Sequence, residues 1–121
     1  MQESDWDESV ILDAGHLRGF TAGDTDLEIT VLTVFTDNTP GYLETLRASD
    51  GENWKSDAHK LKGAARSIGA WRLARVAERA EFMGNPAPGD PRRDAVLDEL
   101  KGRLDELIRH IEDRCRALED E

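Results

Sequence analysis

Apolar residues in the second half of this 121-residue chain recur at every third or fourth position, and this spacing constrains the fold more than any other feature. Side chains at such spacings line one face of an α-helix, which turns once every ~3.6 residues. One stripe consists of Trp54, Ala58, Leu61, Ala65 and Ile68. A second stripe, near the end of the chain, consists of Leu97, Leu100, Leu104, Leu107, Ile111, Cys115 and Leu118. Each stripe predicts a long helix with one buried face, so Cys115 is expected in the core.

The first half of the chain predicts two more helices, although one segment is ambiguous. Residues 13–20 fit a short helix, and Asp24 is a candidate N-cap for the next one because acidic residues follow it in the first turn. The β-branched run 29–36 favours a strand by propensity, but a single strand would have no partner in this chain. We therefore expect a helix, with Pro40 as a kink or a break. Its buried stripe is predicted to contain Leu27, Val31, Val34, Phe35, Leu43 and Leu46.

Loop and cap signals divide the rest of the chain. Gly69 marks the end of one helix, and residues 70–83 predict the next. Its expected buried residues are Leu73, Val76, Ala77, Ala80 and Met83. Residues 84–89 form a loop rich in Gly and Pro, after which Asp90 and Pro91 have the pattern of a helix start.

The predicted architecture is an all-α, up-down four-helix bundle with one or more short additional N-terminal helices. Four sizeable amphipathic helices joined by short loops describe such a bundle. We assign residues 13–121 to the bundle and residues 1–12 to an acidic, flexible lead-in. We expect a monomer, although the heptad-like stripe of the last helix would also suit pairing with a second copy of the chain.

Composition argues against several classes of protein. The net charge of −10 disfavours a nucleic-acid binder, because phosphates would repel the chain. No apolar run approaches the ~20 residues that span a bilayer, so no membrane association is expected. A single cysteine, three dispersed histidines and an acidic N-terminus predict a cytoplasmic protein with no metal site and no cofactor of its own.

The basic residues gather in one stretch of the sequence. Residues 55–79 contain seven Lys or Arg and two acidic residues, a net charge of +5, which leaves −15 for the remainder. Such a stretch is either a solvated helix face or a local site for an anion or an acidic partner.

His59 is the residue in this basic stretch that suits chemistry. On a helix it lies about 140° from the apolar stripe, on the same face as Lys62, Gly63 and Arg66. A neutral imidazole has a nucleophilic ring nitrogen, and Lys62 supplies a cation one turn away. Gly63 costs the helix about 1 kcal/mol relative to Ala but clears space beside the imidazole. A nucleophile, a cation and a cleared space suit the reversible covalent capture of a phosphoryl group.

A short motif surrounds His59. Residues 58–63 have the sequence Ala-His-Lys-Leu-Lys-Gly, and residues 69–70 are Gly-Ala. Together with the helical patterns before and after it, this motif resembles the signature of histidine-containing phosphotransfer (HPt) domains of two-component phosphorelays. The resemblance covers most of the chain. It implies a helical bundle that carries a phosphoryl group between proteins.

The resemblance implies roles for individual residues. His59 matches the histidine that accepts a phosphoryl group from the aspartate of a receiver domain, or donates one to it. Lys62 matches the lysine that neutralises the phosphoryl charge, and Gly63 matches the small residue that lets the receiver approach. Lys60 and Arg66 lie beside this site, and we expect them to contact the partner. Glu81 lies near a position where many members carry a polar residue facing the site.

The resemblance also implies which partners the chain has and which of the two proteins supplies the metal ion. The expected partners are response-regulator receiver domains, a hybrid sensor histidine kinase, or both, with Mg²⁺ held by the receiver domain. The chain itself would be a covalent carrier without its own nucleotide or metal site. The basic run Arg72, Arg75 and Arg79 departs from the family pattern and would face the acidic surface of a particular partner.

Three alternatives compete with phosphotransfer. A helical docking module would bind an acidic partner through the basic face without chemistry. An enzyme that uses His59 as a general base would need an orienting carboxylate and a cleft, and the sequence reveals neither. A nucleic-acid binder would need aromatic residues interleaved with the basic ones.

Overall fold

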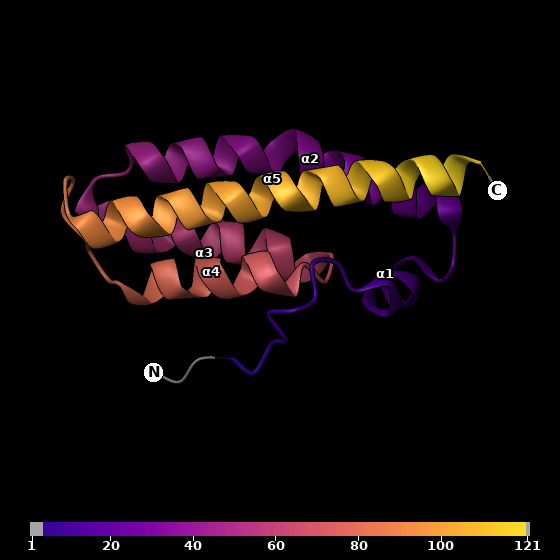
Figure 1. Ribbon diagram of the computed structural model, residues 1–121, viewed down its shortest axis with the longest axis horizontal. Coiled ribbons are helices and arrows are strands. Elements are labelled where there is room, and N and C mark those ends of the chain that lie inside the picture. Colours follow the sequence, from indigo (N-terminus) through magenta and orange to yellow (C-terminus); the bar gives the residue numbers. More distant parts are fainter. Residues whose placement is uncertain (1–3, 121) are drawn as a thin grey trace.

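The computed structural model describes residues 4–120 and contains five helices and no strand within that range. The helices are α1 (Ala14–Thr21), α2 (Thr25–Ala48), α3 (Gly51–Ser67), α4 (Trp71–Phe82) and α5 (Pro91–Glu119). Helices α2 to α5 form a bundle in which each packs against two of the others, and α1 packs against α2. Figure 1 shows α2 and α5 along the whole length of the molecule and the shorter α3 and α4 beside them. The predicted all-α bundle with a short N-terminal helix is confirmed.

Aspartate side chains begin most of these helices. The carboxylates of Asp13, Asp24, Asp50 and Asp90 each accept a backbone N–H from the first turn of the following helix. Such N-caps satisfy donors that have no partner inside the helix. The caps predicted at Asp24 and Asp90 are confirmed.

The ambiguous segment 29–36 is helical, as predicted, and lies within α2. The predicted buried face of α2 is partly wrong, because Leu27 and Val34 are 43% and 52% exposed. The face that is turned inward includes two polar residues, Glu28 and Thr39. Glu28 pairs with Arg114 of α5, and the Thr39 hydroxyl donates to a backbone carbonyl one turn earlier. These partners let polar residues occupy a face that apolar periodicity alone assigns to Leu and Val.

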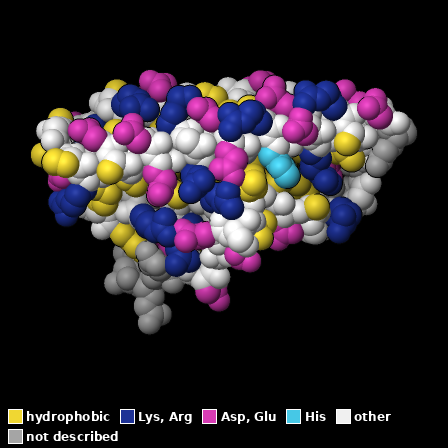
Figure 2. Space-filling view, in the orientation of Figure 1, with side chains coloured by type: hydrophobic (Ala, Val, Ile, Leu, Met, Phe, Trp, Pro, Cys, Tyr) yellow, Lys and Arg dark blue, Asp and Glu magenta, His cyan; other side chains and the backbone are white. Residues whose placement is uncertain are grey.

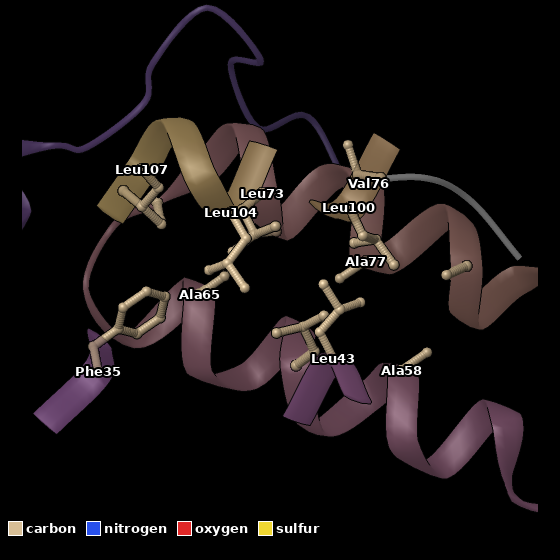
Figure 3. Close-up of a cluster of buried hydrophobic side chains, with 14 of the residues drawn as sticks. Phe35, Leu43, Ala58, Ala65, Leu73, Val76, Ala77, Leu100, Leu104 and Leu107 are labelled. Atoms are coloured by element: carbon tan, nitrogen blue, oxygen red, sulfur yellow. The ribbon is translucent and has the colours of Figure 1, made fainter. Parts of the chain in front are cut away.

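The core stripes of the other helices agree with the sequence pattern. All five residues of the stripe in α3 are buried, as are four of the five predicted in α4 and the first five of the seven in α5. Met83, Cys115 and Leu118 are partly buried instead. Figure 3 shows how the four long helices contribute to one cluster that includes Phe35, Leu43, Ala58, Ala65, Leu73, Val76, Leu100 and Leu104.

The acidic lead-in, described from residue 4 onwards, lies against α4. The Ser4 hydroxyl donates to Glu78 at 2.6 Å, and the ring of Trp6 stacks on that of Trp71 with centroids 5.8 Å apart. The flexibility expected for this segment stays a prediction. None of the helices in the described part of the chain combines the length and the apolar character needed to cross a bilayer.

Arg93 ties three helices together at one end of the bundle. It lies at the start of α5 and is 4% exposed. Its guanidinium donates to the carbonyls of Arg47 and Ser49, at 3.0 and 2.7 Å, and lies 4.7 Å from the ring centroid of Trp54. A buried charge of this kind is stable because backbone oxygens surround it.

Arg93→Ala is therefore expected to lower the free energy of unfolding by about 2–3 kcal/mol, because it removes charge-assisted hydrogen bonds and leaves carbonyls unpaired. Arg92→Ala is the matched control, since the neighbouring Arg92 is exposed and pairs only with Asp90 within the described chain. That change should cost less than about 0.5 kcal/mol. Urea unfolding of both variants tests this assignment, and equal losses would contradict it.

Candidate functional site

His59 lies on the outer face of α3. Its side chain is 65% exposed, whereas Ala58 and Leu61 on the opposite face of the same helix are buried. The solvent-facing position predicted from the helical spacing agrees with the structure. The imidazole is therefore within reach of a partner protein while its helix remains fixed in the core.

The Glu81 carboxylate of α4 holds both His59 and Lys62. Its Oε2 lies 2.5 Å from His59 Nδ1, and its Oε1 lies 2.6 Å from Lys62 Nζ. The Glu81 side chain is 7% exposed and that of Lys62 is 13% exposed. His59 and Lys62 are one turn apart on α3, so one carboxylate on the neighbouring helix can bridge them.

Small residues bring the two helices together at this point. Ala77 and Ala80 of α4 and Ala58 of α3 are fully buried, and the Trp54 indole donates to the Ala80 carbonyl at 2.6 Å. This contact fixes α4 against α3 next to Glu81. The packing therefore fixes where the Glu81 carboxylate lies, along the helix axis, relative to the His59 imidazole.

The pKa of Glu81 is held below its ordinary value of 4.5. Burial acts to raise this pKa, but the hydrogen bonds from Lys62 and His59, together with their charges, outweigh that effect. Glu81 is thus ionised at neutral pH. An ionised carboxylate only accepts hydrogen bonds, so it selects the imidazole form that carries its proton on Nδ1. The lone pair of the neutral ring is then on Nε2, away from Glu81.

Gly63 leaves open space on the same helix face. A Cβ atom built at this position would meet no other heavy atom within 4 Å. Gly63 also borders a shallow surface hollow of about 380 Å³, which is lined by His16, Phe20, Gly63, Arg66, Ser67 and Trp71. The space predicted beside His59 is present.

Lys60 and Arg66 are exposed, and each lies over an aromatic ring. Lys60 Nζ is 4.6 Å from the Tyr42 ring centroid, and the Arg66 guanidinium is 5.5 Å from that of Trp6. Arg66 lines the hollow beside Gly63, whereas Lys60 lies over a residue of α2. Contact with a partner stays a prediction for both residues.

The basic run of α4 is engaged within the chain. The contacts join Arg72 to Glu106, Arg75 to the Ser4 carbonyl and Arg79 to Glu8. Figure 2 shows basic and acidic side chains interleaved over the face in view. Within the +5 stretch, Arg72 and Arg79 are therefore paired with acids of α5 and of the lead-in.

The family resemblance alone placed Glu81 near the site, and nothing in the sequence predicted that its carboxylate orients His59. The general-base alternative was set aside partly because no such carboxylate could be seen, and that argument was wrong, since Glu81 fills this role. Its 22-residue separation from His59 hides the pair from any local pattern. The position of the imidazole still disfavours that alternative, because a side chain that is 65% exposed on a helix face is not shielded from water. Across residues 4–120 no group of three or more His, Cys, Asp or Glu is arranged to hold a metal ion.

Comparison with known proteins gives consistent results. The sequence model of the Hpt domain matches residues 30–113. No curated protein sequence matches the chain. Histidine-containing phosphotransfer protein B of Pseudomonas aeruginosa superimposes with a TM-score of 0.77 at 19% identity, over 88% of this chain and 96% of that one. Histidine phosphotransferase ShpA of Caulobacter crescentus does so with a TM-score of 0.67 at 28% identity, over 89% and 93%.

The lowered pKa of Glu81 predicts how acid affects stability. A carboxylate whose pKa is lower in the folded chain stabilises the fold fully above its unfolded pKa, and loses that contribution as the pH falls through the folded value. The loss of unfolding free energy between pH 7 and about pH 3 should therefore be smaller in Glu81→Gln than in the native chain. Urea titrations at both pH values measure it, and an equal loss in the two proteins would contradict the pairing.

Proposed function

The chain belongs to the Hpt domain family, whose members carry phosphoryl groups in phosphorelays, and we propose that His59 is the residue that carries the phosphoryl group here. The observation that supports this assignment is the 2.5 Å contact between Nδ1 of the exposed His59 imidazole and the Glu81 carboxylate. Because an ionised carboxylate only accepts hydrogen bonds, it favours a proton on Nδ1 and leaves the lone pair on Nε2. The sequence motif around His59 supports it independently.

The proposed transfer forms one bond and breaks one. The Nε2 lone pair attacks the phosphorus of an aspartyl phosphate on a receiver domain, an N–P bond forms, and the acyl P–O bond breaks to release the carboxylate. The imidazole gains positive charge in this step, and the adjacent Glu81 carboxylate stabilises that charge through Nδ1–H. Transfer in the other direction reverses these events.

The remaining chemistry is assigned to the partner. We propose that the receiver domain holds the Mg²⁺ that neutralises the transferring phosphoryl group, and that this chain has no nucleotide, metal or cofactor site of its own. The proposed partners are response-regulator receiver domains, a hybrid sensor histidine kinase, or both, acting on a monomer in the cytoplasm. A protein of this type is a covalent carrier that returns to its starting state after each cycle.

His59→Gln is expected to abolish phosphotransfer. The native chain, mixed with Mg²⁺ and a receiver domain labelled with ³²P on its aspartate, should gain a label that survives alkali and is lost in acid. His110→Gln is the matched control, since His110 is also exposed on a helix and should leave labelling unchanged. Phosphotransfer would be contradicted if no receiver domain from the same source labelled the native chain while His59→Gln still bound a receiver domain. The docking module would then be the function that remains.

Gly63→Leu is expected to slow transfer from a receiver domain by about tenfold or more, because a large side chain one turn from His59 would keep the partner from closing. Its labelling by the small donor phosphoramidate should change little. Gly102→Leu is the control, as Gly102 also lies in a helix with open space around it. Equal slowing with both donors would show that Gly63 does not serve partner approach.

A further inference from the structure

Arg66 is a cation on the outer face of α3 whose hydrogen-bond donors are not used within the described chain. It follows Gly63 by three residues and lines the hollow beside it. Its side chain is exposed, and across residues 4–120 its guanidinium forms no hydrogen bond and no ion pair. The three arginines of α4 differ, because carboxylates or carbonyls of the chain accept hydrogen bonds from each of them. The donors of Arg66 are therefore available to a partner.

The contact that Arg66 makes within the described chain is with the ring of Trp6 in the lead-in. The guanidinium carbon lies 5.5 Å from the ring centroid, which is within the range of a cation–π interaction. The face of the ring attracts the positive charge without taking up the in-plane N–H donors. The contact therefore restricts a flexible side chain and leaves it able to bind a carboxylate through two parallel hydrogen bonds.

Trp6 is itself held by the start of α4. Its ring stacks on that of Trp71, with centroids 5.8 Å apart and planes inclined by 24°. The Trp71 indole donates to the Asp13 carboxylate at 3.0 Å, and the His16 ring meets Trp71 at its edge, 5.2 Å between centroids. The lead-in, α1 and α4 thus meet at Trp71, and this packing places Trp6 beside the last turn of α3.

The charge of the chain makes a local cation important for partner binding. The net charge is −10, and the surface with which a receiver domain holds Mg²⁺ would itself be acidic, so the two surfaces repel each other. Opposite charges placed where two proteins meet offset such repulsion and help to select the partner. Lys62 is already bound to Glu81, and Lys60 lies over a ring of α2. Among the residues that line the hollow beside Gly63, the Lys or Arg is Arg66.

We propose that Arg66 binds a carboxylate on the receiver domain and that Trp6 is a positioning residue, which holds Arg66 for this contact. This inference rests on the proposed function, because the hollow beside Gly63 is where a receiver domain would approach His59. The carboxylate would enter that hollow, whose wall includes the exposed ring of Phe20. The lead-in then contributes to the affinity for the partner through Arg66, and a purely structural role for Trp6 would act whether or not Arg66 is present.

The test is a double-mutant cycle on transfer from a phosphorylated receiver domain in Mg²⁺. The receiver concentration that gives half the maximal rate is measured separately from the maximal rate. Arg66→Gln should raise this concentration by about tenfold, because charge-assisted hydrogen bonds are lost. Trp6→Leu should raise it by about threefold, but by less than about 1.5-fold in a chain that already carries Arg66→Gln. The maximal rate, and labelling by phosphoramidate, should stay within about twofold of the native values.

Two further variants separate positioning from attachment of the lead-in. Trp6→Phe keeps an aromatic ring and should restore most of the native half-saturating concentration. Ser4→Ala removes a hydrogen bond between the lead-in and Glu78 but leaves the ring in place, so it should not change that concentration.

Three results would overturn the inference. They are an unchanged half-saturating concentration in Arg66→Gln, the same loss from Trp6→Leu with and without Arg66, and an equal loss in Ser4→Ala. A native chain that neither phosphoramidate nor any receiver domain labels would instead overturn the proposed function.

Discussion

The Glu81 carboxylate is buried between α3 and α4 and needs two donors to remain ionised there, His59 Nδ1 and Lys62 Nζ. An unpaired charge that is buried to this extent would cost several kcal/mol. The two helices must therefore keep a fixed register along their axes, so that both donors stay within reach of Glu81. The alanines at their interface permit the close approach, and the bond from the Trp54 indole to the Ala80 carbonyl fixes it. The orientation of the His59 imidazole is therefore a consequence of helix packing.

The rest of the bundle keeps α3 rigid while one face of it remains free. Helices α2 and α4 cover the apolar stripe of α3, and α5 closes the core behind them. The lead-in binds α4 through the Ser4 carbonyl at Arg75 and the Glu8 carboxylate at Arg79. Consequently, the histidine faces solvent beside the space at Gly63, while acids of the same chain engage the basic run. In the proposed function, a partner would approach the outer face of α3 that carries His59 and Gly63.

The helices and the solvent-exposed position of His59 could be predicted from the sequence, because both depend on local spacing. The stripe from Trp54 to Ile68 defines the inside of α3 and so places His59 outside. Features that depend on distant partners could not be predicted in this way. The burial of Glu28 requires Arg114, which is 86 residues away, and the role of Glu81 requires a helix register that no local pattern contains. The basic run was similarly assigned to a partner, because the acids that pair with Arg72 and Arg79 lie in other elements, the lead-in and α5.

In the proposed function, Glu81 fixes the proton on Nδ1, and Nε2 is the nucleophile. Long-range ¹H–¹⁵N NMR of the His59 imidazole in mildly alkaline solution, before and after reaction with phosphoramidate, tests it directly. We expect a protonated Nδ1 in the free chain and a ³¹P–¹⁵N coupling to Nε2 in the phosphorylated chain. A free ring that carries its proton mainly on Nε2, or a phosphoryl group on Nδ1, would contradict it.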